Sequence, residues 1–216
     1  MYKVWDDDRE LNGYERCLLQ LSCLPEFQWV EDKLKPDDCD IEAYDRLNHI
    51  REEIDKFVHS AGNLLIMGEN LGCGKTSWAV KLLLSYIEAH ENDIAGIDAE
   101  LADSGYYIPG MFIQTIPFLV EMKQFGNNQN ALERYNRICK ADLVVFDDVA
   151  AVNMTQYDYT ILYALIERRV FAGQSCIYTS NATSLKDLEK ELGPRLADRI
   201  WKNSLKIELK GRGFRH

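Results

Sequence analysis

The residues from Gly68 to Thr76 have the types and spacing that bind phosphate. They lie between a short apolar run and a helical pattern, so this phosphate loop joins a predicted strand to a predicted helix. Gly72 and Gly74 let the backbone approach phosphate oxygens closely, and the helix N-terminus offers free N–H groups to the anion. Lys75 can reach the outer phosphates, and the Thr76 hydroxyl can coordinate magnesium. The expected nucleotide contacts are Asn70, Leu71, Gly72, Cys73, Gly74, Lys75, Thr76 and Ser77.

The phosphate loop departs from the usual pattern at its start. The pattern requires glycine five residues before the Gly-Lys pair, and Glu69 occupies that place, with Gly68 one residue earlier. Either the loop carries one extra residue or the first glycine has been replaced. A degenerate loop that no longer binds nucleotide is the alternative interpretation, and Glu69 is the argument for it.

Two carboxylates follow a second apolar run. Leu143–Phe146 reads as a buried strand, and Asp147 and Asp148 come directly after it. Because unpaired buried charge is costly, such a pair beside a phosphate site predicts a cation. We expect Asp147 to bind magnesium together with Thr76, directly or through water, and Asp148 to activate a water molecule as general base. The alternative is a strand end with two solvated acids.

Two polar features follow further along the chain. Asn181 comes after an apolar strand, where a neutral amide could hold the attacking water or contact the terminal phosphate; otherwise it is a turn residue. Arg195 and Arg199 are four residues apart, on one face of a predicted helix. Guanidinium groups held on a helix suit phosphate charge on a neighbouring subunit. The alternative is that the arginines pair with acids of their own chain or are simply solvated charges.

Alternating strands and helices must position these residues. The predicted strands are 63–67, 111–115, 143–146, 175–180 and 205–209. The predicted helices are 41–58, 75–90, 116–125, 131–139, 159–170, one that follows a capping pair at Ser184 and Asp187, and one that begins at Pro194. The strands are continuous apolar runs, which indicates a parallel sheet covered on both faces. Ligands bind such sheets beyond the carboxyl ends of the strands, where the phosphate loop, the two carboxylates and Asn181 all fall.

Composition narrows the class of protein and its partners. The chain has 216 residues with an ordinary globular content of hydrophobic residues, and no apolar run approaches the roughly 18 residues of a membrane helix. Six irregularly spaced cysteines favour reduced thiols and a cytoplasmic location. The net charge of −10 argues against a surface that grips duplex DNA throughout, although Gly193–His216 holds seven basic and two acidic residues.

These motifs, in this order, resemble the AAA+ ATPases of the DnaC/DnaI helicase-loader and IstB group. The resemblance also covers 112–119 and 164–169 and extends from about residue 40 to the C-terminus. It implies an α/β P-loop NTPase sheet of the ASCE type, in which one strand separates the phosphate-loop strand from the Asp-Asp strand, without a C-terminal helical lid. It implies ATP or ADP with Mg2+ bound between protomers. The implied assignments are Walker B for Asp147 and Asp148, sensor 1 for Asn181, and the arginine-finger region for Arg199 with Arg195 nearby.

The same resemblance implies a function. Residues 37–216 would form the ATPase domain, and residues 1–36 would dock a replicative helicase of the DnaB type, through apolar side chains at Trp5, Tyr14, Leu18, Leu19 and Leu21. Self-association into a ring or spiral would hold the helicase open for loading onto single-stranded DNA. The compact length is consistent with a bacteriophage origin. The alternatives are an IstB-like DNA-binding transposition regulator, a small-molecule P-loop kinase and a scaffold that binds nucleotide with little hydrolysis.

Overall fold

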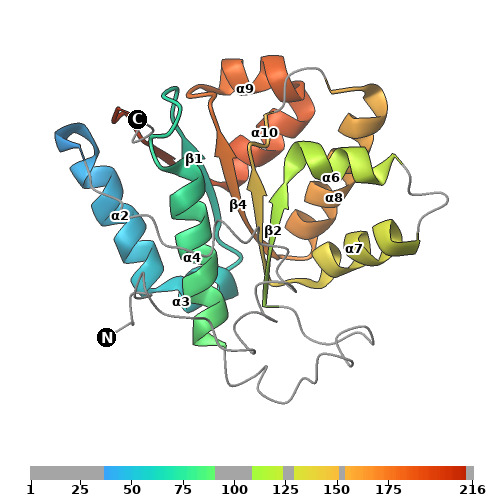
Figure 1. The fold of residues 1–216 in the computed structure, drawn as a ribbon, viewed down its shortest axis with the longest axis horizontal. Coiled ribbons are helices and arrows are strands. Elements are labelled where there is room, and N and C mark those ends of the chain that lie inside the picture. The colour runs from blue at the N-terminus through green and yellow to red at the C-terminus, as the bar shows by residue number, and fades with distance from the viewer. Residues whose placement is uncertain (1–36, 91–108, 124–128, 151–153, 213–216) are drawn as a thin grey trace.

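A five-stranded parallel sheet forms the centre of the structure, a computed structural model that describes residues 37–90, 109–123, 129–150 and 154–212. Figure 1 shows the sheet between its helices. The strands are β1 (Asn63–Met67), β2 (Gly110–Gln114), β3 (Leu143–Asp147), β4 (Ser175–Ser180) and β5 (Leu205–Glu208). Their order is β2-β3-β4-β1-β5, and every neighbouring pair is parallel. β4 lies between β1 and β3, so the predicted strand between the phosphate loop and the two carboxylates is confirmed.

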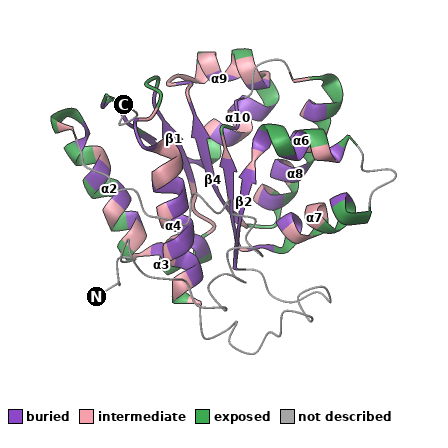
Figure 2. Cartoon of the chain, viewed as in Figure 1, coloured by how far each residue is buried: buried purple, intermediate pink, exposed green. Residues whose placement is uncertain are grey.

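Helices cover both faces of the sheet, and the sheet separates the hydrophobic core into two layers (Figure 2). One face carries α2 (Ile41–Glu52), α3 (Ile54–His59) and α4 (Lys75–Ala89). The other face carries α6 (Thr115–Met122), α7 (Gln129–Lys140), α8 (Gln156–Phe171), α9 (Leu185–Leu192) and α10 (Pro194–Asn203). Because both faces are covered, the central strands are buried along most of their length, as their continuous apolar runs predicted. In the described parts of the chain, no helix has the length and apolar character needed to cross a bilayer.

The helix predicted over 41–58 is interrupted once. Glu53 separates α2 from α3 with a backbone conformation of φ −111° and ψ 27°. The interruption is shallow, because the Glu53 N–H still donates to His49 O and the Phe57 N–H to Glu53 O. Ile50 and Ile54 on either side are both buried, so the two helices keep one apolar face toward the sheet.

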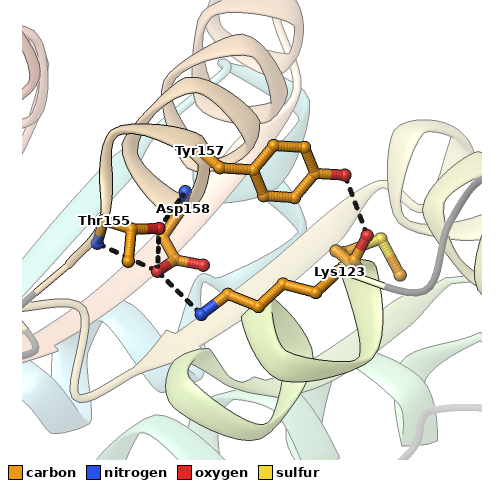
Figure 3. A network of polar contacts seen from close by, with 5 residues as sticks. Lys123, Thr155, Tyr157 and Asp158 are labelled. Atoms are coloured by element: carbon orange, nitrogen blue, oxygen red, sulfur yellow. Dashed lines mark hydrogen bonds and ion pairs between the residues drawn. The ribbon is translucent and has the colours of Figure 1, made fainter.

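A polar network ties the start of α8 to the end of α6 (Figure 3). Thr155 and Asp158 form a capping box, in which each side chain accepts the other residue's backbone N–H. Asp158 also pairs with Lys123 Nζ at 3.1 Å, and the Tyr157 hydroxyl donates to Met122 O at 3.0 Å. The network therefore holds the start of α8 against the end of α6. The Ser184 side chain likewise accepts the Asp187 N–H at the start of α9, which confirms that predicted cap.

An arginine in α8 is fully buried, which the sequence analysis did not predict. Arg169 has an exposed fraction of 0% and donates through Nη1 and Nη2 to backbone carbonyls at the end of α7 and the starts of β3 and β4. The acceptors are Ile138 O, Ala141 O, Asp142 O and Ser175 O, at 2.5 to 3.1 Å. No carboxylate among the described residues pairs with it. The carbonyls at a helix C-terminus carry partial negative charge, so they compensate the buried cation and Arg169 joins three elements.

Candidate nucleotide-binding site

The phosphate loop has the backbone that its glycines predicted. It runs from β1 to α4, with φ of 77° at Gly72 and 99° at Gly74, in the region that side chains with a Cβ rarely adopt. Gly74 is the residue before the first turn of α4, so the free N–H groups of that turn lie directly after the loop. Lys75 Nζ donates to Gly68 O at 2.7 Å and Asn70 O at 3.2 Å across the loop.

The structure explains the unusual start of the loop. A Cβ at Gly68 would lie 2.4 Å from Leu209 O and 2.9 Å from Cys73 Sγ, so packing requires glycine at this position. Glu69 is exposed, and its carboxylate accepts a hydrogen bond from the Thr183 hydroxyl at 3.3 Å. The glycine one residue early is therefore fitted to the end of β5, and Glu69 lies on the surface.

The predicted nucleotide contacts differ in what their side chains do. Leu71 is 76% exposed, whereas Cys73 is buried with its Sγ 3.5 Å from Lys75 Nζ. Ser77 is half-buried in the first turn of α4. The Asn70 amide is bound elsewhere, since its Nδ2 donates to Lys210 O and Gly211 O at 3.0 and 3.1 Å. The Nδ2 group of Asn70 is therefore committed within the chain.

The structure brings Thr76 and Asp147 together, as a magnesium site requires. Thr76 Oγ1 donates to Asp147 Oδ1 at 2.8 Å, and Thr179 Oγ1 donates to the same oxygen at 2.7 Å. Burial raises the pKa of the Asp147 carboxyl above its usual value, while the two hydroxyls and Lys75 oppose the increase. Hydroxyl and carboxylate oxygens are ligands that Mg2+ prefers, and the loop supplies the adjacent phosphate position. The residues present therefore fit a magnesium-bound nucleotide.

Asp148 has a left-handed backbone that turns the chain after β3. Its φ is 51°, uncommon for a residue with a Cβ, and its N–H donates to Thr179 Oγ1 at 2.8 Å. The Val149 N–H donates to Thr179 O at 2.9 Å, which fixes the turn from the β4 side. Partial burial raises the pKa of the Asp148 carboxyl, and the charge of Lys75 opposes this. The carboxylate still reaches solvent, as the proposed activation of a water requires.

Three residues that the sequence analysis missed support this end of the sheet. Thr179 binds both carboxylate residues, and the buried Thr115 donates through its hydroxyl to Asp147 O at 2.8 Å. Glu191 in α9 is a third acid near Asp148; burial raises the pKa of its carboxyl, and the charge of Asp148 adds to this. The strand-end position of Thr179 could have revealed it, but Glu191 reaches the site only through the packing of α9.

We predict that Thr179→Val weakens the binding of Mg2+ at the nucleotide site. Valine keeps the shape but loses the donor to Asp147 and the acceptor for the Asp148 N–H, each worth about 1 kcal/mol or more at a buried site. The Mg2+ concentration that half-saturates nucleotide binding should therefore rise about fivefold or more. Thr179→Ser keeps the hydroxyl, so its half-saturating Mg2+ concentration should equal that of the unmodified protein. An unchanged magnesium titration in the valine variant would show that Thr179 does not position the site.

The remaining predicted site residues lie on two different elements. Asn181 follows β4 directly and is half-buried, at the same edge of the sheet as the phosphate loop, because β4 pairs with β1. Arg199 in α10 forms an ion pair with Glu167 of α8 at 2.5 Å, the intramolecular alternative considered from sequence. Arg195 is exposed and forms no ion pair within the described part of the chain. The structure therefore brings Asn181 to the site but does not bring the two arginines there in the single chain.

The sheet order, the helices on both faces and the loop between β1 and α4 make up the α/β P-loop fold expected from the sequence, and solved replication proteins share it. A DnaC helicase loader structure is similar, with a TM-score of 0.62 and 20% identity over 86% of this chain and 100% of that one. DnaI is similar, with a TM-score of 0.61 and 18% identity over 87% of this chain and 95% of that one.

The replication initiator DnaA, bound to AMPPCP and single-stranded DNA, has a TM-score of 0.59 and 16% identity over 82% of this chain and 51% of that one. The chain thus spans about half the length of that DnaA structure. No known sequence family and no curated protein matches the amino-acid sequence. The resemblance to helicase loaders that the motifs indicated is confirmed at the level of the fold.

Proposed function

We propose that the protein is an ATP-dependent loader of a DnaB-type replicative helicase onto single-stranded DNA. One observation carries the proposal: Thr76 of the phosphate loop donates to Asp147 at 2.8 Å, in a fold whose match to a DnaC helicase loader structure covers all of that chain. ATP, or ADP after hydrolysis, would bind along the loop. Thr76 and Asp147 would hold Mg2+, which when bound would neutralise phosphate charge.

The residues at the edge of the sheet have separate roles in the proposed hydrolysis. Lys75 would leave its loop carbonyls to contact the outer phosphates, where its charge stabilises the transition state. Asp148 would accept the proton of the attacking water, and its turn, fixed by Thr179, would hold the carboxylate in place. The Asn181 amide would orient that water without adding charge. This division of roles follows the resemblance of the motifs to those of AAA+ ATPases, and the exposure of Asp148 is compatible with its part in it.

Single-stranded DNA would contact the loops at the carboxyl edge of the sheet rather than the basic C-terminal strip. The charge of that strip is partly neutralised, because Lys202 pairs with Asp198 at 2.9 Å and Lys210 with Glu208 at 3.7 Å. The ion pair of Arg199 removes a third cation from it. DnaA, which shares the fold, has been solved with single-stranded DNA. The helicase-docking role expected for residues 1–36 lies outside the described residues and stays part of the proposal, as does assembly into a ring or spiral.

We predict that Arg199→Ala leaves nucleotide affinity unchanged but reduces turnover in the assembled state by about tenfold or more. As an arginine finger, Arg199 would exchange its Glu167 partner for phosphate of a neighbouring protomer. Glu167→Gln is the matched variant, because it frees Arg199 and should preserve turnover. The turnover of both variants is measured by steady-state hydrolysis at protein concentrations that permit assembly. Normal turnover by Arg199→Ala would exclude it as the finger and move the test to the exposed Arg195.

DNA-dependent hydrolysis separates the proposed loader from its alternatives. ATP turnover is measured alone, with a single strand, and with the duplex of the same sequence. A loader should respond to the single strand. Retention on duplex with no response to the single strand would favour the IstB-like regulator, phosphate transfer to small acceptors would indicate a kinase, and tight binding with no turnover under any condition would indicate a scaffold.

A further inference from the structure

The chain after β5 lies against the phosphate loop. In this C-terminal segment, defined as Leu209–Arg212, the Leu209 N–H donates to Met67 O at 2.7 Å and extends the pairing of β5 with β1. Leu209 O occupies the space that a Cβ at position 68 would need. Two carbonyls, of Lys210 and Gly211, then accept the two hydrogen bonds from Asn70 Nδ2.

Two aspartates hold the opposite side of the same segment. Asp40 is 2% exposed, and its two oxygens accept the N–H groups of Lys210 and Gly211 at 2.7 and 2.8 Å. Asp37 accepts the Arg212 N–H at 2.7 Å. Bonds from backbone N–H groups to an ionised carboxylate are among the stronger hydrogen bonds, and they compensate the burial of Asp40. A Cβ at Gly211 would lie 2.5 Å from Asp40 Oδ2, so the contact is close.

These contacts account for the glycine at position 68 and for the commitment of the Asn70 side chain. Gly68 is glycine because Leu209 O lies against it, and the Asn70 side chain is committed to the segment. The backbone carbonyl of Asn70 also accepts a hydrogen bond from the Lys75 ammonium group. A continuous chain of hydrogen bonds therefore runs from Lys75 through Asn70 and the segment to Asp40.

We propose that Asp40 is a positioning residue for the nucleotide site, acting through the C-terminal segment on the phosphate loop. The proposal rests on the proposed nucleotide binding and adds its regulation. With the segment attached, Gly72 and Gly74 already have the conformation that brings backbone N–H groups to phosphate. Detachment frees Asn70, so the loop must be ordered when nucleotide binds, at a cost in affinity. Linkage then requires that bound nucleotide strengthens the attachment by the same factor.

The coupling would reach both ends of the domain. Residues 1–36 directly precede Asp37 in the chain, and residues 213–216 directly follow Arg212. Both connections are anchored by the same group of bonds beside the phosphate loop. Occupancy of the nucleotide site would thus alter how firmly Asp37 and Arg212 are held.

The test combines nucleotide titration with hydrogen exchange on the full chain. Asp40→Asn replaces one acceptor of the segment with a donor and should weaken binding of an ATP analogue with Mg2+ by about fivefold or more. Gly211→Ala should do the same by displacing the segment from Asp40 without changing charge. Asp38→Asn, an exposed aspartate in the same turn, is the matched control and should bind as the unmodified protein does. In the unmodified protein, saturating analogue should slow exchange of the amides of Lys210, Gly211 and Arg212.

Each outcome decides the proposal. Weaker binding in both variants, together with nucleotide-dependent protection of the three amides, supports it. Unchanged affinity in a folded Asp40→Asn variant overturns it while the proposed function stands. If both variants fail to fold, the exchange measurement on the unmodified protein decides, and no change at the three amides overturns the coupling. Absence of nucleotide binding by the unmodified protein would overturn the proposed function and this inference with it.

Discussion

Replacing Lys75 with alanine is expected to abolish nucleotide binding at accessible concentrations. The ammonium lies inside the phosphate loop, bound to Gly68 O and Asn70 O, at the N-terminus of α4. A charge-assisted contact to phosphate in this setting is worth about 3 kcal/mol, or roughly a hundredfold in the dissociation constant. Loss of the two loop contacts adds to the effect, because the loop must then be ordered by the nucleotide. Titration with a fluorescent ATP analogue measures the loss.

The control for this variant is Lys140→Ala, which removes an exposed lysine at the end of α7. It should bind nucleotide like the unmodified protein. Both variants should still fold and unfold cooperatively, which unfolding curves check, since Lys75 is only half-buried. Undiminished affinity in a folded Lys75→Ala variant would mean that the phosphate loop is not where nucleotide binds.

The largest loss of stability is expected from Arg169→Met. Methionine fills part of the space but leaves the carbonyls of Ile138, Ala141 and Ser175 buried without their donors. A buried acceptor left without its donor costs about 1–3 kcal/mol, so three of them together remove a large part of the roughly 5–15 kcal/mol that stabilises a domain. Urea denaturation should therefore show a much lower midpoint, or no folded baseline.

Arg168→Met provides the comparison at the neighbouring position. Arg168 is exposed, so its replacement should change the free energy of unfolding by about 0.5 kcal/mol or less. Equal midpoints for the two variants would contradict the role of Arg169 as the joint between α7, β3 and β4. Because the bonds of Arg169 lie at the amino ends of these strands, the nucleotide affinity of any folded fraction should stay near that of the unmodified protein.

Patterns of apolar residues predicted the strands closely. β1 and β4 have the predicted bounds, and β2 begins one residue earlier than predicted, at Gly110. Thr115, predicted to end that strand, begins α6, and its hydroxyl donates to Asp147 O on the neighbouring strand. Local sequence could place the strands because burial on both faces leaves an uninterrupted apolar signature. It could not place a contact between residues 32 positions apart.

Some contacts of the candidate site could be predicted from the sequence, and others depend on tertiary packing. Thr76 and Asp147 could be predicted to meet, because strand ends of a parallel sheet converge at one edge. The bond between Asn70 and Gly211, and the approach of Glu191 to Asp148, depend on how β5 and α9 pack, and no spacing in the sequence encodes that. The same holds for Arg199. Its helix was predicted, but the choice of Glu167 as its partner depends on how α8 packs against α10.

Native mass spectrometry of the protein with a hexameric DnaB-type helicase tests the proposed loader function most directly. The mixture is examined with an ATP analogue, with ADP and without nucleotide, and Lys75→Ala serves as the variant that cannot bind nucleotide. The predicted result is a complex of several copies of this chain on one helicase hexamer that depends on the nucleotide and is lost in the variant. A helicase that stays hexameric and uncomplexed under every nucleotide condition would contradict the proposed function.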